Sequence, residues 1–356
     1  MSSHIPRSVR LNALVRLAVL VSRAALVRLA VRASTAVLVP LGAPVRQAAL
    51  VPQVALVRLA GSVALVVLVA LGTLVVALVI DSASAARVAQ AKANAVSPAV
   101  QPSEDLPIFD AHIHYNRDVW SLYSVDEALA ILDQAGVYKA FVSSTPDEGS
   151  LQLAARAPDR IVLDLRPYRT PSDPATWTRD PSITMYLEER LPERHYAGIG
   201  EFHLMPGEVQ RNEVPREVAD LAVQRGLILH AHADAQAVEE LLQLRPDIRV
   251  LWAHAGMSAS PGGVRQLLEL HPNLWVELAL RTDVAPGGRL DPAWAALFTD
   301  YPDRFMIGTD TWIPSQWTRL PSLMADVRVW LRQLPPEVAR AIASGNAERV
   351  LTSLLP

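Results

Sequence analysis

The sequence predicts an α/β fold for residues 106–356, a closed barrel of eight parallel strands, and three observations support this. Eight short apolar segments alternate with longer segments of helical periodicity, the rhythm of repeated strand–helix units. The length, about 250 residues, is usual for one (β/α)8, or TIM-type, barrel. Histidines and acidic residues fall at the C-terminal ends of the apolar segments, where such barrels build active sites.

Each predicted strand is a short apolar run. The eight strands are 107–114, 139–144, 160–166, 197–203, 227–234, 248–254, 274–280 and 304–310. Helices are predicted between most of them, for example over 125–136 and 234–245. In the second of these, Ala237, Val238 and Leu241 fall on one helical face. Proline and glycine mark the junctions between the segments.

The first 105 residues differ from this body in composition. Residues 1–60 are a low-complexity region of Val, Leu, Ala and Arg, in which the phrase ALVRLA occurs three times. Residues 61–81 contain an uncharged apolar run long enough to span a bilayer as a helix. The small residues after it resemble a signal-peptidase site. We therefore expect a signal or a transmembrane anchor over 61–81, followed by a linker over 82–105.

This front region predicts where the barrel resides. Its arginines should stay in the cytoplasm, so the barrel would be exported, either periplasmic or membrane-anchored outside the cytoplasm. Membrane contact is expected only through the N-terminal hydrophobic segment. An alternative is that residues 1–60 come from a wrongly assigned start codon, which their repetitive composition also fits.

Composition excludes several kinds of chemistry. The chain has no cysteine, so disulfides, thiol nucleophiles and Cys-type zinc sites are excluded, and a metal must bind to His, Asp or Glu. Net charge is −3 although residues 1–100 are basic, so the remaining body is acidic. An acidic body argues against nucleic acid and in favour of a small-molecule partner. An oligomer is compatible with the sequence.

Polar side chains with metal-binding chemistry gather at the predicted strand ends. They are His112 and His114 on the first strand, Glu201 and His203 on the fourth, His230 and His232 on the fifth, His254 on the sixth and Asp310 on the eighth. In a strand, residues two apart share one face, so His112 and His114 should project together. Six of the nine histidines therefore converge on one rim of the barrel.

Imidazoles and carboxylates on one rim suit a divalent cation. Such an ion lowers the pKa of a bound water to about 7 and can polarise a carbonyl. Asp310 could bind the ion, accept the proton of the water, or do both. His232 is the preferred ligand on its strand because it lies nearer the strand end, whereas His230 should sit deeper. His203, just past its strand, is expected to face the substrate.

Six motifs now resemble the amidohydrolase superfamily, in particular its amidohydrolase-2 branch. They are DAHIH (110–114), GIGEF (198–202), HAHAD (230–234), WAHAG (252–256), IGTD (307–310) and SGNAERVL (344–351), and the likeness covers 107–353. The resemblance implies a metal-dependent hydrolase, or a non-oxidative decarboxylase, which this branch also contains.

The resemblance also implies site roles. His112, His114, His232, His254 and Asp310 match the family's ligand and catalytic positions. Many members carry a carboxylated lysine on the fourth strand, but this chain offers Glu201 there and no lysine. Glu201 is then either a ligand or the site holds a single ion. We expect one or two divalent ions, most simply zinc, with manganese as the alternative.

Substrate contacts are expected from the loops after the strands. The candidates are Arg166, Arg169, Arg281, Trp312 and His230. Arginines bind carboxylates and phosphates, which favours a small anionic substrate. The predicted reaction is hydrolysis of an amide, ester or lactone, with Asp310 moving the proton and His254 or His203 steadying the oxyanion. The alternatives are the decarboxylase and a non-catalytic, membrane-anchored barrel.

Overall fold

The computed structural model describes residues 106–352, which include nearly all of the predicted barrel. The predicted low-complexity region, signal or anchor segment and linker (1–105) lie outside the described residues. Among residues 106–352, no helix combines the length and the apolar character needed to cross a membrane.

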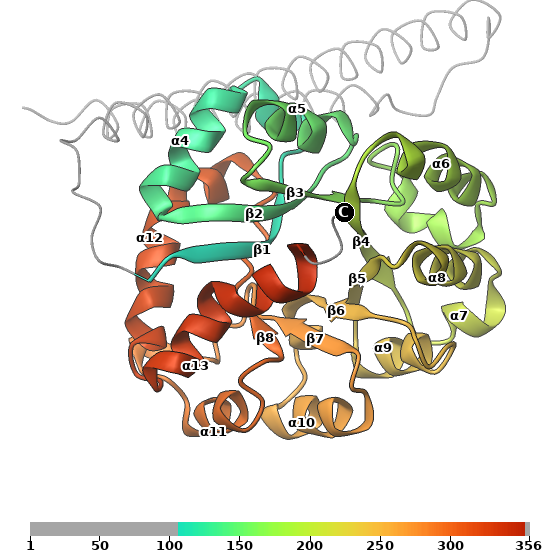
Figure 1. Cartoon of the computed structure of the whole chain (residues 1–356). Coiled ribbons are helices and arrows are strands. Elements are labelled where there is room, and N and C mark those ends of the chain that lie inside the picture. The colour runs from blue at the N-terminus through green and yellow to red at the C-terminus, as the bar shows by residue number, and fades with distance from the viewer. Residues whose placement is uncertain (1–105, 353–356) are drawn as a thin grey trace, which may run out of the picture. The chain divides into compact units, whose positions relative to one another are not determined.

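The eight predicted strands form one parallel sheet in chain order, and each strand pairs with the next (Figure 1). They are β1 (Ile108–His114), β2 (Val137–Ser143), β3 (Ile161–Leu165), β4 (Tyr196–Leu204), β5 (Ile228–Ala233), β6 (Val250–Trp252), β7 (Leu274–Glu277) and β8 (Phe305–Met306). The sheet closes because the chain after β8 returns to β1. There the Ala111 amide donates to the Ile307 carbonyl at 2.8 Å, and Ile113 bridges Thr311. The prediction of a TIM-type barrel is confirmed.

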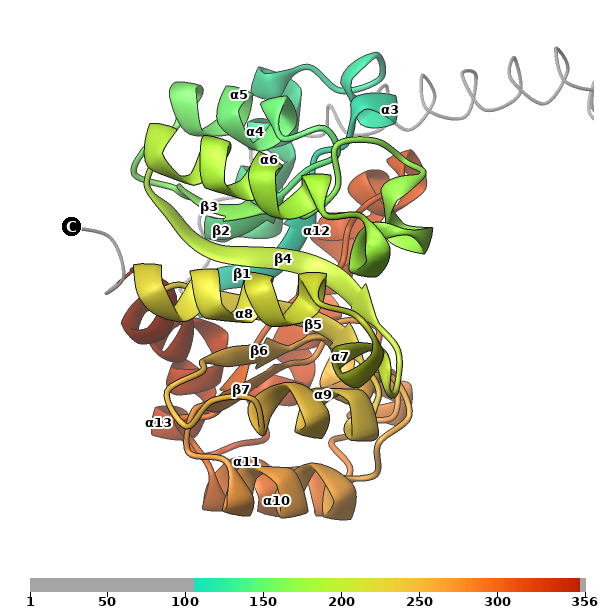
Figure 2. The same cartoon turned by 90° about the vertical axis from the view of Figure 1, so that its right-hand side faces the viewer.

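Helices form the outer layer around the strands (Figure 1 and Figure 2). They are α3 (Arg117–Trp120), α4 (Val125–Ala135), α5 (Glu148–Arg156), α6 (Ser182–Arg190), α7 (Glu208–Arg211), α8 (Val214–Arg225), α9 (Ala235–Leu242), α10 (Pro261–Leu270), α11 (Pro292–Asp300), α12 (Pro314–Leu331) and α13 (Pro336–Arg340). In α4, Ser124 and Glu127 form a reciprocal cap at the N-terminus, and Gly136 ends the helix in the left-handed conformation. This explains the close match to the predicted helix over 125–136.

The last three strands are shorter than the sequence predicted. The predicted strands ran to 254, 280 and 310, but the regular pairing ends at Trp252, Glu277 and Met306. The cause is the backbone beyond them, since His254, Leu280 and Asp310 have φ values of 58°, 61° and 48°. A residue in this left-handed conformation turns the chain out of an extended strand. The polar residues at these ends therefore sit on turns.

A small apolar cluster occupies the barrel interior away from these turns. It joins strand residues such as Phe109, Phe141 and Ile228 to the C-terminal residues Val350 and Leu351. Half of its eight buried strand members lie at the first or second position of strands five or more residues long. The apolar floor of the barrel is thus closed by the C-terminal segment, and the carboxyl ends are left for polar side chains.

Candidate metal centre and active site

Four buried polar side chains from three strands meet at the carboxyl ends. The Nε2 atoms of His112 and His114, both on β1, lie 3.0 Å apart. Oε2 of Glu201, on β4, is 3.4 Å from each of these nitrogens. Oδ1 of Asp310, which follows β8, lies 3.4 Å and 3.2 Å from them. All four side chains can offer one ligand atom to the same point.

Hydrogen bonds at the other ring nitrogens orient the two histidines. Nδ1 of His114 lies 3.1 Å from the carbonyl oxygen of Ser143, which can only accept, so this nitrogen carries a proton. Nδ1 of His112 lies 3.0 Å from Oε1 of Glu277. In their neutral forms, both rings then present the lone pair of Nε2 to the two carboxylates. A metal ion between the four groups would be bound by these four acceptors, whereas without an ion the Nε2–H groups of the two histidines donate to the carboxylates.

The spacing of these acceptors fits a small divalent ion. A tetrahedral ion with bonds of about 2.0–2.2 Å holds its ligands about 3.3 Å apart. The separations between the two histidines, and between each histidine and the two carboxylates, are 3.0–3.4 Å and match that value. Histidine nitrogen and carboxylate oxygen are ligands of zinc and related ions. The residues present therefore fit a divalent metal.

The charge of the site also favours a cation. Burial alone would raise the pKa of Glu201, but His112 and hydrogen bonds from His112, His114 and His232 hold it well below its usual value. Burial likewise opposes ionisation of Asp310, yet His112 and His114 keep its pKa low. Glu277 adds a third carboxylate nearby. The guanidinium of Arg166, 3.2 Å from Oε2 of Glu201, offsets only part of this charge.

Two site residues occupy a backbone conformation that is unfavourable for side chains other than glycine. His254 and Asp310 both have positive φ values. Such residues cost about 1–3 kcal/mol each and persist where surrounding contacts hold them. Here the His254 amide donates to Oε1 of Glu277 at 2.6 Å, and the Asp310 amide donates to the His112 carbonyl at 2.7 Å. These contacts point both side chains toward the cluster.

Glu277, on β7, is a site residue that the sequence reasoning missed. It is fully buried and accepts from His112, from the His254 amide and, through Oε2, from the Ala279 amide at 2.6 Å. Burial would raise its pKa, but His112 and His254 lower it to about 2. Space for it comes from Gly308, where a Cβ atom would overlap Oε2. A single acid inside an otherwise apolar strand was the available signal.

His254, His232 and His203 surround Glu201 on the side away from β1. Oε1 of Glu201 lies 2.9 Å from Nδ1 of His232 and 3.3 Å from Nε2 of His254. The ring of His203 lies beside that of His232, tilted by 33°, with centroids 4.3 Å apart. Glu201, His203 and His232 form a second group with metal-ligand spacing. His232, the preferred ligand, thus contacts Glu201 from outside the four-residue cluster.

His230 lies deeper in the barrel than His232, as its place along the strand indicates. Its ring is in edge-to-face contact with His112, and its Nδ1 lies 3.0 Å from Oδ2 of Asp164, on β3. Only 1% of its surface is exposed. Burial lowers the pKa of His230 well below its usual value. This position gives no support to the prediction that His230 contacts the substrate.

The three predicted substrate arginines are placed differently. Arg166 donates to the carbonyl of Glu201 at 3.0 Å as well as to its carboxylate, so it belongs to the site. Arg169 instead pairs with Asp173 and Asp180 in its own loop. Arg281 pairs with Asp283 and donates to backbone carbonyls. The charges of the latter two are neutralised within the protein, which argues against a substrate role. Trp312 is 46% exposed and follows Asp310 on the rim.

Together, these observations define the class of protein: a (β/α)8 barrel with a buried His/Glu/Asp cluster for a divalent metal at its catalytic face. The model of the amidohydrolase family, in its amidohydrolase-2 form, matches residues 109–352. The chain belongs to this family and is an amidohydrolase-family metal-dependent hydrolase. No curated protein matches the chain.

Solved structures are similar to this chain at low sequence identity. A TIM-barrel protein from Bordetella bronchiseptica is 14% identical, with a TM-score of 0.50. The match covers 70% of this chain and 99% of the Bordetella chain. Amidohydrolase 2 from Bifidobacterium longum subsp. infantis is 16% identical, with a TM-score of 0.42 and coverages of 69% and 99%. Dihydroorotase from Campylobacter jejuni is 13% identical, with a TM-score of 0.45 and coverages of 68% and 82%.

Proposed function

We propose that this protein hydrolyses an amide, ester or lactone bond of a small anionic molecule. The observation that carries the proposal is the convergence of the Nε2 atoms of His112 and His114 with the carboxylates of Glu201 and Asp310. Zinc is the expected ion, with manganese as the alternative, and the neighbouring group around His232 leaves room for a second ion.

A divalent ion bound at this cluster would lower the pKa of a coordinated water and polarise a carbonyl oxygen. Side chains of the protein would then accept and donate the proton. Asp310 is held in its ionised form, so its carboxylate can take the proton released by the attacking water and pass it to the leaving group. Its Oδ2 atom lies 3.9 Å from Nε2 of His254.

His254 is suited to hold negative charge that develops on the substrate oxygen. Burial would lower its pKa, but Glu277 and Glu201 raise it above its ordinary value. The raised pKa favours the charged imidazole, which in a buried site is a strong donor to an oxyanion. Arg166 is 9% exposed and pairs with Glu201 in the same site, so an anionic substrate would have to share its guanidinium with that carboxylate.

The reaction class is tested with the full chain loaded with zinc or manganese. The protein is incubated separately with lactones, carboxylic esters and amides that carry a second carboxylate, and with unsaturated and aromatic carboxylic acids. We expect hydrolysis of at least one bond of the first group. Release of carbon dioxide from the acids without hydrolysis of any ester, amide or lactone would instead establish the decarboxylase.

Replacing the proposed proton carrier is the sharpest test of mechanism. We expect Asp310→Asn to lower kcat by about 10²–10⁴, because an amide cannot accept the proton. Metal content is measured in parallel by elemental analysis, so that loss of the ion is separated from loss of the base. Asp118→Asn, a change at an exposed residue of α3, is the control. Full activity of a metal-loaded Asp310→Asn enzyme would contradict the assigned role.

We also propose export of the barrel, either by a cleaved signal or by an anchor over 61–81. The support is the apolar run and the basic residues before it. Fractionation of cells that express the full chain, with N-terminal sequencing of the product, tests this proposal. An uncleaved chain recovered with the soluble cytoplasmic fraction would contradict it.

A further inference from the structure

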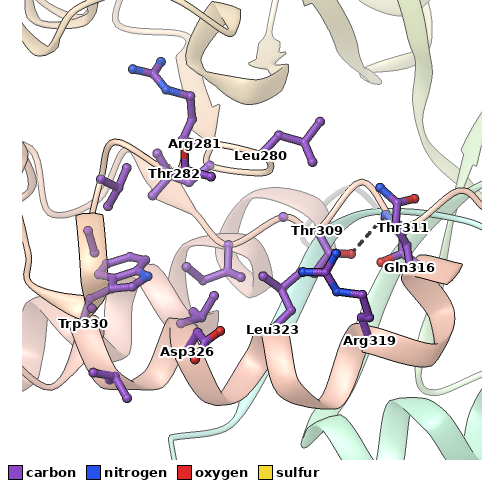
Figure 3. A pocket seen from close by; sticks show the side chains of 18 of the residues that line it. Leu280, Arg281, Thr282, Thr309, Thr311, Gln316, Arg319, Leu323, Asp326 and Trp330 are labelled. Carbon is purple, nitrogen blue, oxygen red and sulfur yellow. Dashed lines mark hydrogen bonds between the residues drawn. The ribbon is translucent and has the colours of Figure 1, made fainter. Parts of the chain in front are cut away.

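A cavity of about 600 Å³ lies between α12 and the chain segments that follow β7 and β8 (Figure 3). Residues of all three segments line it, including Leu280 after β7, Thr311 after β8, and Arg319 and Leu323 on α12. This volume is within the range of pockets that hold small organic ligands. We call it the α12 cavity.

The α12 cavity and the metal cluster share one wall, the chain after β8. Thr309 and Thr311 line the cavity, whereas Asp310, between them, belongs to the cluster. No residue of the four-residue cluster lines the cavity. A ligand in the cavity would therefore lie behind the strand end that carries Asp310, separate from the proposed reacting groups.

One cation in the α12 cavity is unpaired. Figure 3 shows the side chain of Arg319 rising from α12 into the cavity, on the side of Thr309 and Thr311. Within residues 106–352, its guanidinium has no ion pair or hydrogen bond to another side chain or to the backbone. The neighbouring Arg281, in contrast, is neutralised by Asp283 at 2.7 Å. Arg319 is thus the cavity cation available to a ligand carboxylate.

Thr311 lies beside this guanidinium but does not offer its hydroxyl to the cavity. The residue is 1% exposed, and less than 1 Å² of its hydroxyl oxygen is accessible. The contact to a ligand carboxylate is therefore left to Arg319.

The rest of the lining selects for an apolar ligand body. Leu280 and Leu323 are large apolar side chains that remain 46% and 38% exposed, and Trp330 closes the far end. Asp326 also lines the cavity, seven residues after Arg319 and therefore about 10 Å further along the helix axis. Its negative charge would repel a second anionic group at the far end of a ligand.

We propose that the α12 cavity binds a small monocarboxylate with an apolar tail. The carboxylate would contact Arg319, and the tail would lie along Leu280 and Leu323 toward Trp330. This site is separate from the metal centre, and the proposal does not depend on which bond the enzyme hydrolyses.

The test uses three probes of similar length: octanoate, its neutral amide octanamide, and the dicarboxylate suberate. Binding to the full chain is measured by isothermal titration calorimetry, with and without a metal chelator. We expect octanoate to bind at least tenfold more tightly than octanamide or suberate, and equally well with the chelator present. Equal affinity for octanoate and octanamide, or loss of octanoate binding with the metal, would overturn the proposal.

Variants then assign the contacts. Arg319→Gln should abolish the preference for octanoate over octanamide, whereas Arg225→Gln, at an exposed residue of α8, should leave it unchanged. Asp326→Asn should strengthen suberate binding several-fold and leave octanoate binding unaltered. Circular dichroism confirms that each variant folds. An Arg319→Gln protein that still prefers octanoate would show that the carboxylate binds elsewhere.

Discussion

At the scale of single residues, His112 illustrates how a metal ligand is prepared by its neighbours. One ring nitrogen faces the cluster and the other faces the carboxylate of Glu277. The same carboxylate fixes the His254 amide, so one acid positions groups on two strands. Such outer contacts set the orientation and basicity of a ligand.

Glu277→Gln should weaken metal binding about 10–100-fold, because the charge opposite Nδ1 of His112 is lost. The dissociation constant for zinc, measured by competition with a chromophoric chelator, checks this expectation independently of activity. Glu188→Gln, at an exposed residue of α6, should leave it unchanged. If both variants bound zinc as tightly as the unmodified protein, Glu277 would not position the ligand.

At the scale of elements, the C-terminal segment after α13 holds the short strand β8 in place. Asn346 is fully buried, and its side-chain amide donates to the carbonyls of Pro302 and Phe305, each at 2.8 Å. Pro302 precedes β8 and Phe305 is its first residue, and this strand leads to Asp310. The motif around Asn346 therefore anchors the catalytic strand.

Asn346→Ala should lower the free energy of unfolding by about 2 kcal/mol or more, because two backbone carbonyls near β8 lose their donor. Urea denaturation followed by circular dichroism measures the change. Asn273→Ala is the matched control, since Asn273 makes a similar bond to the Pro246 carbonyl at an exposed position. A loss of equal size in the two variants would contradict the anchoring role.

The same segment is fastened to β2 through Glu348. Its carboxylate accepts from the Tyr138 hydroxyl at 2.8 Å and pairs with Lys139. Burial and this carboxylate raise the pKa of Tyr138 to about 12. The neutral phenol is the form that donates, so this stabilisation is complete below about pH 10, the ordinary pKa of tyrosine. It is lost as the pH rises through about 12.

Difference absorbance of phenolate during an alkaline titration tests this pH dependence. Subtracting the titration of Tyr138→Phe from that of the unmodified protein isolates one tyrosine, which should ionise near pH 12. In the Glu348→Gln background, the same subtraction should give a lower midpoint. A midpoint near the ordinary tyrosine value of about 10 in the unmodified protein would contradict the contact.

At the scale of the whole molecule, the cluster joins distant parts of the chain. Its members come from β1, β4 and the end of β8, so a bound ion would connect the two strands that close the barrel. The unfolded chain has no such site, and binding free energy therefore adds to folding free energy.

Removing the metal should lower thermal stability. Free zinc at about 100 times its dissociation constant adds about 2.7 kcal/mol, which corresponds to roughly 5–10 °C in Tm for a domain of this size. Differential scanning calorimetry of the full chain with zinc or with chelator measures the shift. His114→Ala should show almost no dependence on zinc. A Tm independent of zinc in the unmodified protein would contradict metal binding at the cluster.

The sequence by itself determined the barrel, the order of its strands and the groups available for a metal. Strand–helix alternation is a local property of the chain, and parallel strands place their carboxyl ends at one face. Convergence of residues as distant as His112 and Asp310 was therefore predictable from their positions at strand ends. The motifs around them also indicated the family.

Only the tertiary structure decided which of these groups meet, and why. The left-handed turns at His254 and Asp310, the role of Glu277, and the pairing of Arg169 and Arg281 within the protein depend on contacts across strands and loops. Distances of a few ångströms between side chains are set by packing and hydrogen bonds among residues far apart in the chain. These distances cannot be predicted from periodicity and spacing along the sequence.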